Sequence, residues 1–275
     1  MKWWRVAVSE PLPGAADELF AEGAVAAAQE EDLLIGHFVE AAEAEAAVVA
    51  LRRAGLSAAL AAGLAEGPPA WAQEWVREQV AVQISPRLAI APSFVAAPAA
   101  EIVLTVNPGL AFGTGTHPTT WLCLRALEAR QLRGLRVLDV GTGTGLLAVA
   151  ALRLGAASAL GIDVDAVALR TARRVADRNG APALALLDRA PSLCGPHGLV
   201  LANLPPEVQE SLAPEVAAAV APGGTLLLSG FLVEQTDTLL RLLSRRGLRE
   251  VRREERAGWA LLELRAVEGT SASRP

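Results

Sequence analysis

The sequence predicts an α/β protein, in which a doubly wound and mostly parallel sheet follows a small α+β domain. The run Val137 to Ala150, VLDVGTGTGLLAVA, reads as a buried strand, a tight glycine turn and the first turns of a helix, and the apolar run Ala159 to Asp163 reads as the next strand. Strand, turn, helix and strand in this order are typical of a parallel sheet covered by helices. With 275 residues, of which 52% are hydrophobic, the chain can bury the cores of one large and one small domain.

The small domain is predicted over residues 1–66. Alternating side chains and turn residues indicate four strands and two helices, in the order strand, helix, strand, strand, helix, strand: Trp3 to Val8, Ala15 to Glu22, Ala24 to Gln29, Leu33 to Val39, Glu40 to Ala54 and Ser57 to Ala62. This order is that of a ferredoxin-like unit.

Charge is unevenly divided between the two parts of the chain. Residues 1–66 hold 11 acidic and 4 basic side chains, a net charge of −7, whereas residues 67–275 hold 19 acidic and 21 basic side chains, a net charge of +2. An acidic domain repels the phosphates of nucleic acids and favours a basic partner, which predicts a basic protein substrate and no direct nucleic-acid readout. A solvated acidic face without a partner is the alternative interpretation.

The remaining residues are predicted to form a connection, residues 67–97, a second domain, residues 98–266, and a tail, residues 267–275. The connection holds a Gly- and Pro-containing linker, an amphipathic helix and two strands: Trp71 to Glu78, Val80 to Ile84 and Leu88 to Ala91. The second domain continues with four further helices and three further strands and closes with an antiparallel hairpin. These elements are expected over Trp121 to Ala129, Ala166 to Asn179, Ala183 to Leu187, Gly198 to Asn203, Pro206 to Val220, Thr225 to Ser229, Glu234 to Arg246, Arg249 to Arg256 and Trp259 to Arg265.

The glycine turn is predicted to bind a nucleoside. Gly141 and Gly143 lack a Cβ, so the backbone can take a positive φ and a ligand can approach the main chain and the free N–H groups of the following helix. Asp163 ends the next strand 22 positions after Gly141, where an acid can accept hydrogen bonds from ribose hydroxyls. Because Gly145 comes two residues after Gly143 rather than three, the spacing argues against a nicotinamide dinucleotide and hence against a dehydrogenase.

The stretch Asn107 to Thr120, NPGLAFGTGTHPTT, predicts a loop folded over the same site. Its glycines, prolines and threonines make it too rich in turn residues for a core element. Thr119 and Thr120 are expected just before the helix that begins at Trp121, where a hydroxyl caps the helix or reaches a ligand. His117 is expected to hydrogen-bond its own backbone.

These motifs resemble those of known enzymes. The glycine turn with its following acid resembles class I S-adenosylmethionine-dependent methyltransferases, which implies their Rossmann-like doubly wound sheet with a C-terminal antiparallel hairpin. The sequences NPGLAFGTGTHPTTWLCLRALE, GLRVLDVGTGTGLLAVAALRLGA, WAQEWVREQVAVQISPRLAIAP and PGGTLLLSGFLVEQ are similar to the bacterial ribosomal protein L11 methyltransferase family over most of residues 70–265. The resemblance implies S-adenosyl-L-methionine as cofactor, with Thr120, Gly141, Gly143, Asp163 and Asn203 as cofactor-binding residues.

The resemblance also implies a substrate. It points to protein N-methylation of ribosomal protein L11 on lysine ε-amines and the N-terminal α-amine, with residues 1–66 recognising the substrate and Asn203 orienting the amine as the catalytic residue. The chain departs from the family at Pro205-Pro206, which resembles the Asn-Pro-Pro-aromatic motif of enzymes that methylate planar nitrogens. Glu207 stands where that aromatic residue would be, and the chain has no tyrosine, so an aliphatic amine is favoured.

The same sequence also bears on metal sites, on cellular location and on other functions. The sequence has no metal-ligand spacing, so no metal site is expected. It has no apolar run of transmembrane length and no signal peptide, so we expect no membrane association and a cytoplasmic protein. The protein is expected to be a monomer. Methylation of another protein or of an RNA nitrogen, and a catalytically silent ribosome-binding protein, remain the alternatives.

Overall fold

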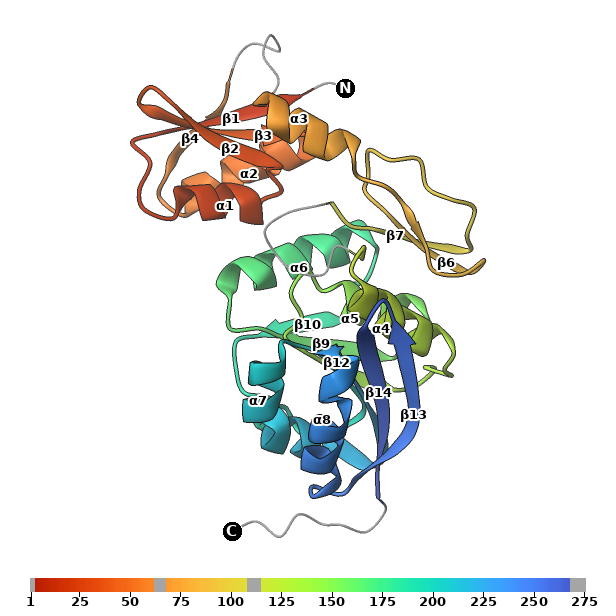
Figure 1. Ribbon diagram of the computed structural model, residues 1–275. Coiled ribbons are helices and arrows are strands. Elements are labelled where there is room, and N and C mark those ends of the chain that lie inside the picture. The colour runs from red at the N-terminus through yellow and green to blue at the C-terminus, as the bar shows by residue number, and fades with distance from the viewer. Residues whose placement is uncertain (1–2, 62–67, 108–114, 268–275) are drawn as a thin grey trace.

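The computed structural model describes residues 3–61, 68–107 and 115–267, which form a small N-terminal domain, a connecting sheet and a larger second domain (Figure 1). The mixed α/β fold with a mostly parallel central sheet confirms the predicted fold class. Within these described ranges, no helix combines the length and the apolar character needed to cross a bilayer.

The small domain has the predicted order of elements. Its members are β1 (Trp4–Ser9), α1 (Ala15–Ala21), β2 (Ala26–Glu30), β3 (Leu33–Phe38), α2 (Ala41–Arg53) and β4 (Ser57–Leu60). The strands form one antiparallel sheet in the order β2-β3-β1-β4, as in a ferredoxin-like unit. Alternate residues such as Val6 and Val8 are fully buried and pack with Leu19 of α1 and Leu51 of α2 in one core.

The connection is a helix followed by a small sheet. It contains α3 (Ala70–Arg77), β5 (Val82–Gln83), β6 (Leu88–Ala91) and β7 (Ile102–Thr105), with the strands in the order β5-β6-β7. The strand β7 was not predicted from the sequence. Ile90 and Leu104 are buried in the core of the second domain, so the predicted boundary at residue 97 divides a sheet that packs on that domain.

The second domain is built on a seven-stranded sheet. Its elements are α4 (Pro118–Glu128), β8 (Arg136–Val140), α5 (Leu146–Arg153), β9 (Ser158–Ile162), α6 (Ala166–Arg178), β10 (Leu184–Leu187), β11 (His197–Asn203), α7 (Pro206–Ala218), β12 (Val220–Leu232), α8 (Thr236–Ser244), β13 (Leu248–Arg256) and β14 (Trp259–Ala266). The strand order is β10-β9-β8-β11-β12-β14-β13, in which the last two are antiparallel and form the predicted C-terminal hairpin. The strand β12 begins earlier than predicted, since it includes the Pro-Gly-Gly stretch that was expected to be a turn.

Helices cover both faces of this sheet. Side chains of α4, α5 and α6 bury Val137 and Leu199 on one face, and side chains of α7 and α8 bury Leu138 and Val200 on the other. Successive strand residues thus enter opposite layers, as the doubly wound arrangement requires. Figure 1 shows the helices around this sheet. The carboxyl ends of β8, β9, β10 and β11 meet at one edge, which is where ligands bind in open α/β sheets.

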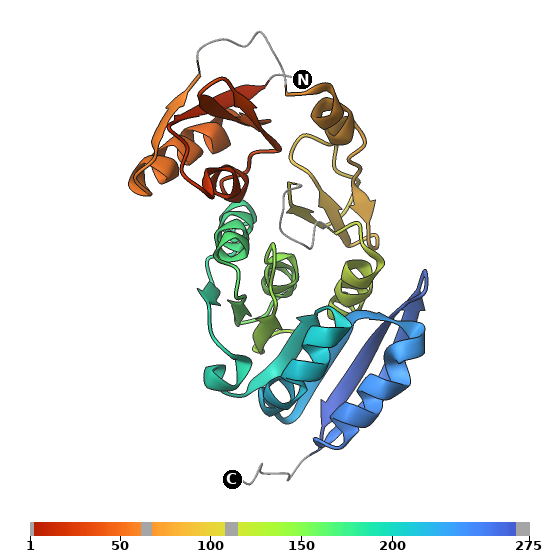
Figure 2. The ribbon, with the colours of Figure 1, turned by 60° about the vertical axis from the view of Figure 1, so that its left-hand side comes forward.

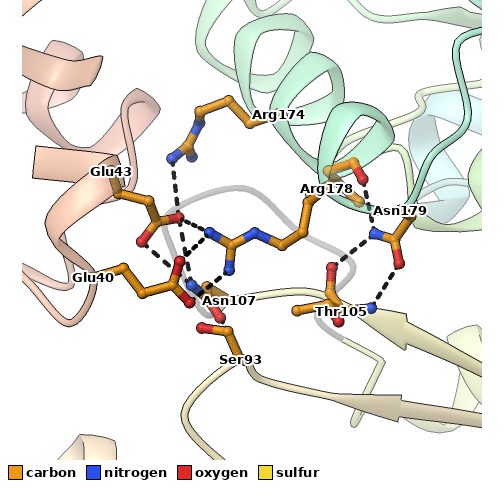
Figure 3. A network of polar contacts seen from close by, with 9 residues as sticks. Glu40, Glu43, Ser93, Thr105, Asn107, Arg174, Arg178 and Asn179 are labelled. Carbon is orange, nitrogen blue, oxygen red and sulfur yellow. Dashed lines mark hydrogen bonds and ion pairs between the residues drawn. The ribbon is translucent and has the colours of Figure 1, made fainter. Parts of the chain in front are cut away.

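The small domain lies next to α6 (Figure 2) and contacts it through ion pairs, of which those of Arg174 and Arg178 are drawn in Figure 3. Three arginines of α6, four residues apart, face its glutamates: Arg170 lies 2.9 Å from Glu18, Arg174 lies 3.9 Å from Glu43, and Arg178 lies 2.7 Å from the same Glu43 carboxylate. We call these three side chains the α6 arginine row. Part of the negative charge of the small domain is therefore neutralised by arginines of the same chain. The sequence had suggested either a basic partner or a solvated acidic face, and these ion pairs are neither.

Candidate active site

A cavity of about 770 Å³ opens at the carboxyl edge of the central sheet. Its walls come from the ends of the parallel strands, the start of α4 and α7, and the start of β14. The lining residues are His117, Thr119, Val140, Gly141, Gly143, Ile162, Asp163, Val164, Asp165, Ala168, Asp188, Arg189, Ala190, Asn203, Leu204, Pro205, Pro206, Val208, Leu212, Gly230 and Trp259. Four of the five predicted cofactor-binding residues, Gly141, Gly143, Asp163 and Asn203, are among them.

The glycine turn has the backbone conformation that its sequence predicts. Gly141, Gly143 and Gly145 all have positive φ, at 66°, 53° and 76°. A Cβ on Gly141 would lie 2.1 Å from Leu204 Cδ2, and one on Gly145 would lie 3.1 Å from Ala172 Cα. The turn therefore needs glycine both for its dihedral angles and for close packing, and it leaves main-chain atoms open to the cavity.

Asp163 stands directly after β9 and faces the glycine turn. One of its carboxylate oxygens accepts from the Gly143 N–H at 2.9 Å, and the other accepts from the Asp165 N–H at 3.0 Å. Since each carboxylate oxygen can accept two hydrogen bonds, acceptor capacity remains for hydroxyl groups in the cavity. This geometry suits the predicted ribose ligand.

We expect Asp163→Ala to weaken S-adenosylmethionine binding by about ten- to a hundredfold, because charge-assisted hydrogen bonds contribute roughly 1.5–3 kcal/mol each. Isothermal titration calorimetry measures the change, and Asp177→Ala, which removes an exposed carboxylate of α6, is the matched control. Unchanged affinity in a folded Asp163→Ala protein would contradict the ribose assignment.

Asp139, the acid within β8, was not singled out from the sequence. Its side chain is 1% exposed, and it accepts from Thr142 Oγ1 at 2.7 Å. Burial raises the pKa of Asp139 to about 6, against the lowering effect of the hydrogen bonds from Thr142 and the Ala148 backbone. The sequence does contain an indication of this role, because Asp139 is an acid inside an apolar strand and stands three residues before Thr142 of the glycine turn. Its hydrogen bond with Thr142 holds the glycine turn against the end of β8.

The raised pKa of Asp139 predicts a pH-dependent stability. The folded state binds a proton at this site more tightly than the unfolded state, so the contribution is fully present below about pH 4 and is lost as the pH rises through about 6. The loss amounts to about 3 kcal/mol by linkage. In urea denaturation between pH 4 and 8, Asp139→Asn should flatten this decline relative to wild type, whereas Asp177→Asn should not; an unaltered slope in Asp139→Asn would refute the linkage.

Asn203 ends β11, the strand that pairs with β8, and lines the cavity next to the glycine turn. Its Oδ1 atom is buried and has no hydrogen-bond partner in the described ranges. Because a buried carbonyl oxygen is costly to leave unpaired, the atom is suited to accept a hydrogen bond from a bound group. Gln209 supports the segment after Asn203, since its Nε2 donates to the carbonyl oxygens of Leu204 and, at 2.8 Å, of Ser229.

The two threonines lie differently from the prediction. His117 is the N-cap of α4 and Pro118 its first residue, so Thr119 and Thr120 lie inside the first turn rather than before it. The His117 ring accepts from the Thr119 N–H at 3.4 Å, as expected for a histidine that bonds its own backbone. Thr119 lines the cavity, whereas the Thr120 side chain is 1% exposed and is not among the lining residues, so the structure does not bring Thr120 to the cavity. Residues 108–114 of the predicted loop lie outside the described residues.

Several lining residues could not be found from local sequence. Trp259 and Gly230 reach the cavity only because β14 inserts next to β12, and this pairing joins segments about 30 residues apart. Asp188, directly after β10, also lines the cavity. Within the described ranges, no group of three or more His, Cys, Asp or Glu side chains could hold a metal ion.

Comparison with known proteins gives a consistent result. A family model described as ribosomal protein L11 methyltransferase (PrmA) matches residues 20–266. Proteins named ribosomal protein L11 methyltransferase from Dechloromonas aromatica and Pelotomaculum thermopropionicum are 46% and 41% identical over 58% and 65% of this chain. These matches span 54% and 60% of the relatives' own length, so the chain matches little more than half of each. The crystal structure of a ribosomal protein L11 methylase from Lactobacillus delbrueckii subsp. bulgaricus is similar with a TM-score of 0.63 and 28% identity, over 68% of this chain and 99% of that one.

Proposed function

Because the chain belongs to the ribosomal protein L11 methyltransferase family, we propose that it transfers methyl groups from S-adenosylmethionine to ribosomal protein L11, on lysine ε-amines and on the N-terminal α-amine. One observation supports this most directly. A single cavity is lined by the glycine turn, by Asp163 and by Asn203, whose buried carbonyl oxygen has no hydrogen-bond partner in the described ranges. It therefore offers a nucleoside site and an amine-binding atom in one enclosure.

The residues present fit the cofactor. S-adenosylmethionine, when bound, supplies a methyl group made electrophilic by its sulfonium. Gly141 and Gly143 line the cavity without a side chain between their main-chain atoms and a ligand, and Asp163 has acceptor capacity left for the ribose hydroxyls. In this proposal these three residues hold the nucleoside and Asn203 contacts the cofactor next to the amine.

The acceptor end of the cavity favours a neutral amine. A lysine ammonium ordinarily has a pKa near 10.4 and must lose a proton before its nitrogen lone pair can attack. Leu204, Pro205 and Pro206 give this end an apolar wall, and desolvation lowers the pKa of an amine. The proton leaves through water, and Asn203 Oδ1 orients the amine by accepting an N–H hydrogen bond, so alignment rather than a strong base provides the rate acceleration.

The small domain is proposed to recognise the basic protein substrate. Glu18, Glu40 and Glu43 already face the α6 arginine row and are not available. Exposed acids elsewhere remain, such as Glu31 and Asp32 at the tip of the β2–β3 hairpin. These side chains suit a basic partner. The activity would be cytoplasmic, where ribosomal proteins are made.

The test is methyl transfer from labelled cofactor. The purified protein is incubated with methyl-labelled S-adenosylmethionine and an extract that lacks this activity, and labelled products are identified by mass spectrometry. Label on lysines or the N-terminus of ribosomal protein L11 supports the proposal. Label on RNA or another protein contradicts the substrate, and cofactor binding without any label favours a silent ribosome-binding protein.

A further inference from the structure

The strand order divides the cavity into two halves. Gly143, Asp163 and Asp188 follow β8, β9 and β10, on one side of the junction between β8 and β11, and form the nucleoside half. Asn203 and Trp259 belong to β11 and β14, on the other side, and form the acceptor half. With a nucleoside in the first half, the second half is the part of the cavity left for the group that receives the methyl.

Trp259 is the largest side chain of the acceptor half and is held in place. It is partly buried against the domain core, and its ring meets the ring of His117 edge to face, with centroids 4.6 Å apart and an interplanar angle of 71°. Across the tip of the same hairpin, the Arg256 guanidinium lies 3.9 Å from the ring centroid of Trp121 in α4. Two contacts thus fix the β13–β14 hairpin to the first turns of α4.

Among the described residues, no carboxylate lines the acceptor half. The carboxylates that line the cavity in the described ranges are Asp163, Asp165 and Asp188, and all belong to the nucleoside half. Burial lowers the pKa of His117, so its imidazole is neutral at pH 7 and adds no positive charge beside Trp259. The aromatic group that this half offers is the indole of Trp259, and the π system of an indole attracts diffuse, weakly hydrated cations such as methylated ammonium groups.

We propose that Trp259 is the specificity-determining residue of the acceptor subsite, where its indole packs along the aliphatic stem of a lysine and attracts the methylated ammonium at the end of that stem. His117 is a positioning residue that holds the indole ring. The proposal rests on the methyltransferase function above. It explains how a mono- or dimethylated lysine, whose ammonium has fewer hydrogen-bond donors, can bind again before it loses a proton and receives a further methyl group.

Binding to the product-loaded protein tests the subsite without turnover. The protein, saturated with S-adenosylhomocysteine, is titrated with Nα-acetyl-Nε-trimethyllysine amide and with the neutral isostere in which carbon replaces the quaternary nitrogen. We expect wild type to bind the cation about tenfold more tightly than the isostere. Trp259→Ala should lose this preference and Trp259→Phe should keep part of it, while Trp71→Ala, which removes a tryptophan that is 60% exposed on α3, should retain it.

Turnover gives the second measurement. For the acceptor protein, Trp259→Phe should lower kcat/KM severalfold and shift products toward lower methylation states, with cofactor affinity unchanged. His117→Phe, which retains an aromatic ring beside the indole, should restore most of what His117→Ala loses. Equal binding of cation and isostere by wild type, or a preference that survives in Trp259→Phe and Trp259→Ala alike, would overturn the subsite. A Trp259-dependent preference in a protein that methylates no substrate would leave the subsite standing and refute the proposed function instead.

Discussion

Replacing Gly230 with alanine is expected to destabilise the second domain by about 4 kcal/mol and to distort the acceptor half of the cavity. Gly230 has a φ of 101°, which an L side chain rarely adopts, and a Cβ there would lie 2.2 Å from the carbonyl oxygen and 2.8 Å from the backbone nitrogen of Leu204. Both contacts are to backbone atoms, so no side-chain rotation relieves them. The displaced segment begins with Asn203, so cofactor affinity and methyl transfer should fall together with the urea midpoint.

Gly134→Ala is the matched control for this substitution. Gly134 also has a positive φ, 81°, but a Cβ there would meet no atom within 4 Å. It should therefore cost only the conformational penalty of about 1–2 kcal/mol. Equal loss of stability in the two variants would mean that the contact with Leu204 is not what requires glycine at position 230.

Asn203→Ala is expected to lower kcat for methyl transfer by about 10²–10³ while leaving the protein folded. The residue presents a buried carbonyl oxygen that has no partner in the described ranges, so its removal from the free protein leaves no broken hydrogen bond there. The substitution removes the group that aligns the amine with the methyl group, and misalignment of reacting groups lowers a rate constant by about this factor. Single-turnover kinetics with labelled cofactor measure the rate, and circular dichroism and thermal unfolding check the fold.

Asn203→Asp separates an orienting role from a structural one. A carboxylate beside the amine would stabilise its ammonium form and raise its pKa, so the pH–rate profile should move to higher pH. A packing defect would lower the rate at every pH and leave the profile in place. Normal rates in Asn203→Ala, or an unmoved profile in Asn203→Asp, would remove Asn203 from the catalytic role.

The parts of this protein that the sequence predicted are those whose chemistry is local. The glycine turn, Asp163 and Asn203 each stand at the carboxyl end of an apolar strand, and parallel strands bring these ends to one edge. The order of the small domain followed from alternation and turn residues in the same way. Thr120 was misplaced by one helical turn, because Pro118 starts the helix earlier than the apolar pattern indicates.

The parts that were not predicted depend on contacts between distant segments. Trp259 enters the cavity through the pairing of β12 with β14, and Asp139 acquires its raised pKa only when helices cover both faces of the sheet. The four-residue strand β7 exists because β6 offers it an edge. The net charge of residues 1–66 shows that the small domain is acidic. It does not show that some of its glutamates face arginines of α6, because that contact joins segments far apart in the sequence.

The α6 arginine row has a consequence for any shortened form of the protein. A fragment without residues 1–66 would present Arg170, Arg174 and Arg178 one helical turn apart, with the glutamates that face them removed. Such a stripe of guanidinium groups binds polyanions, with an affinity that falls steeply as salt is added. RNA retained by that fragment would report the newly exposed stripe rather than a nucleic-acid substrate, so a nucleic-acid acceptor can be judged only with the intact chain.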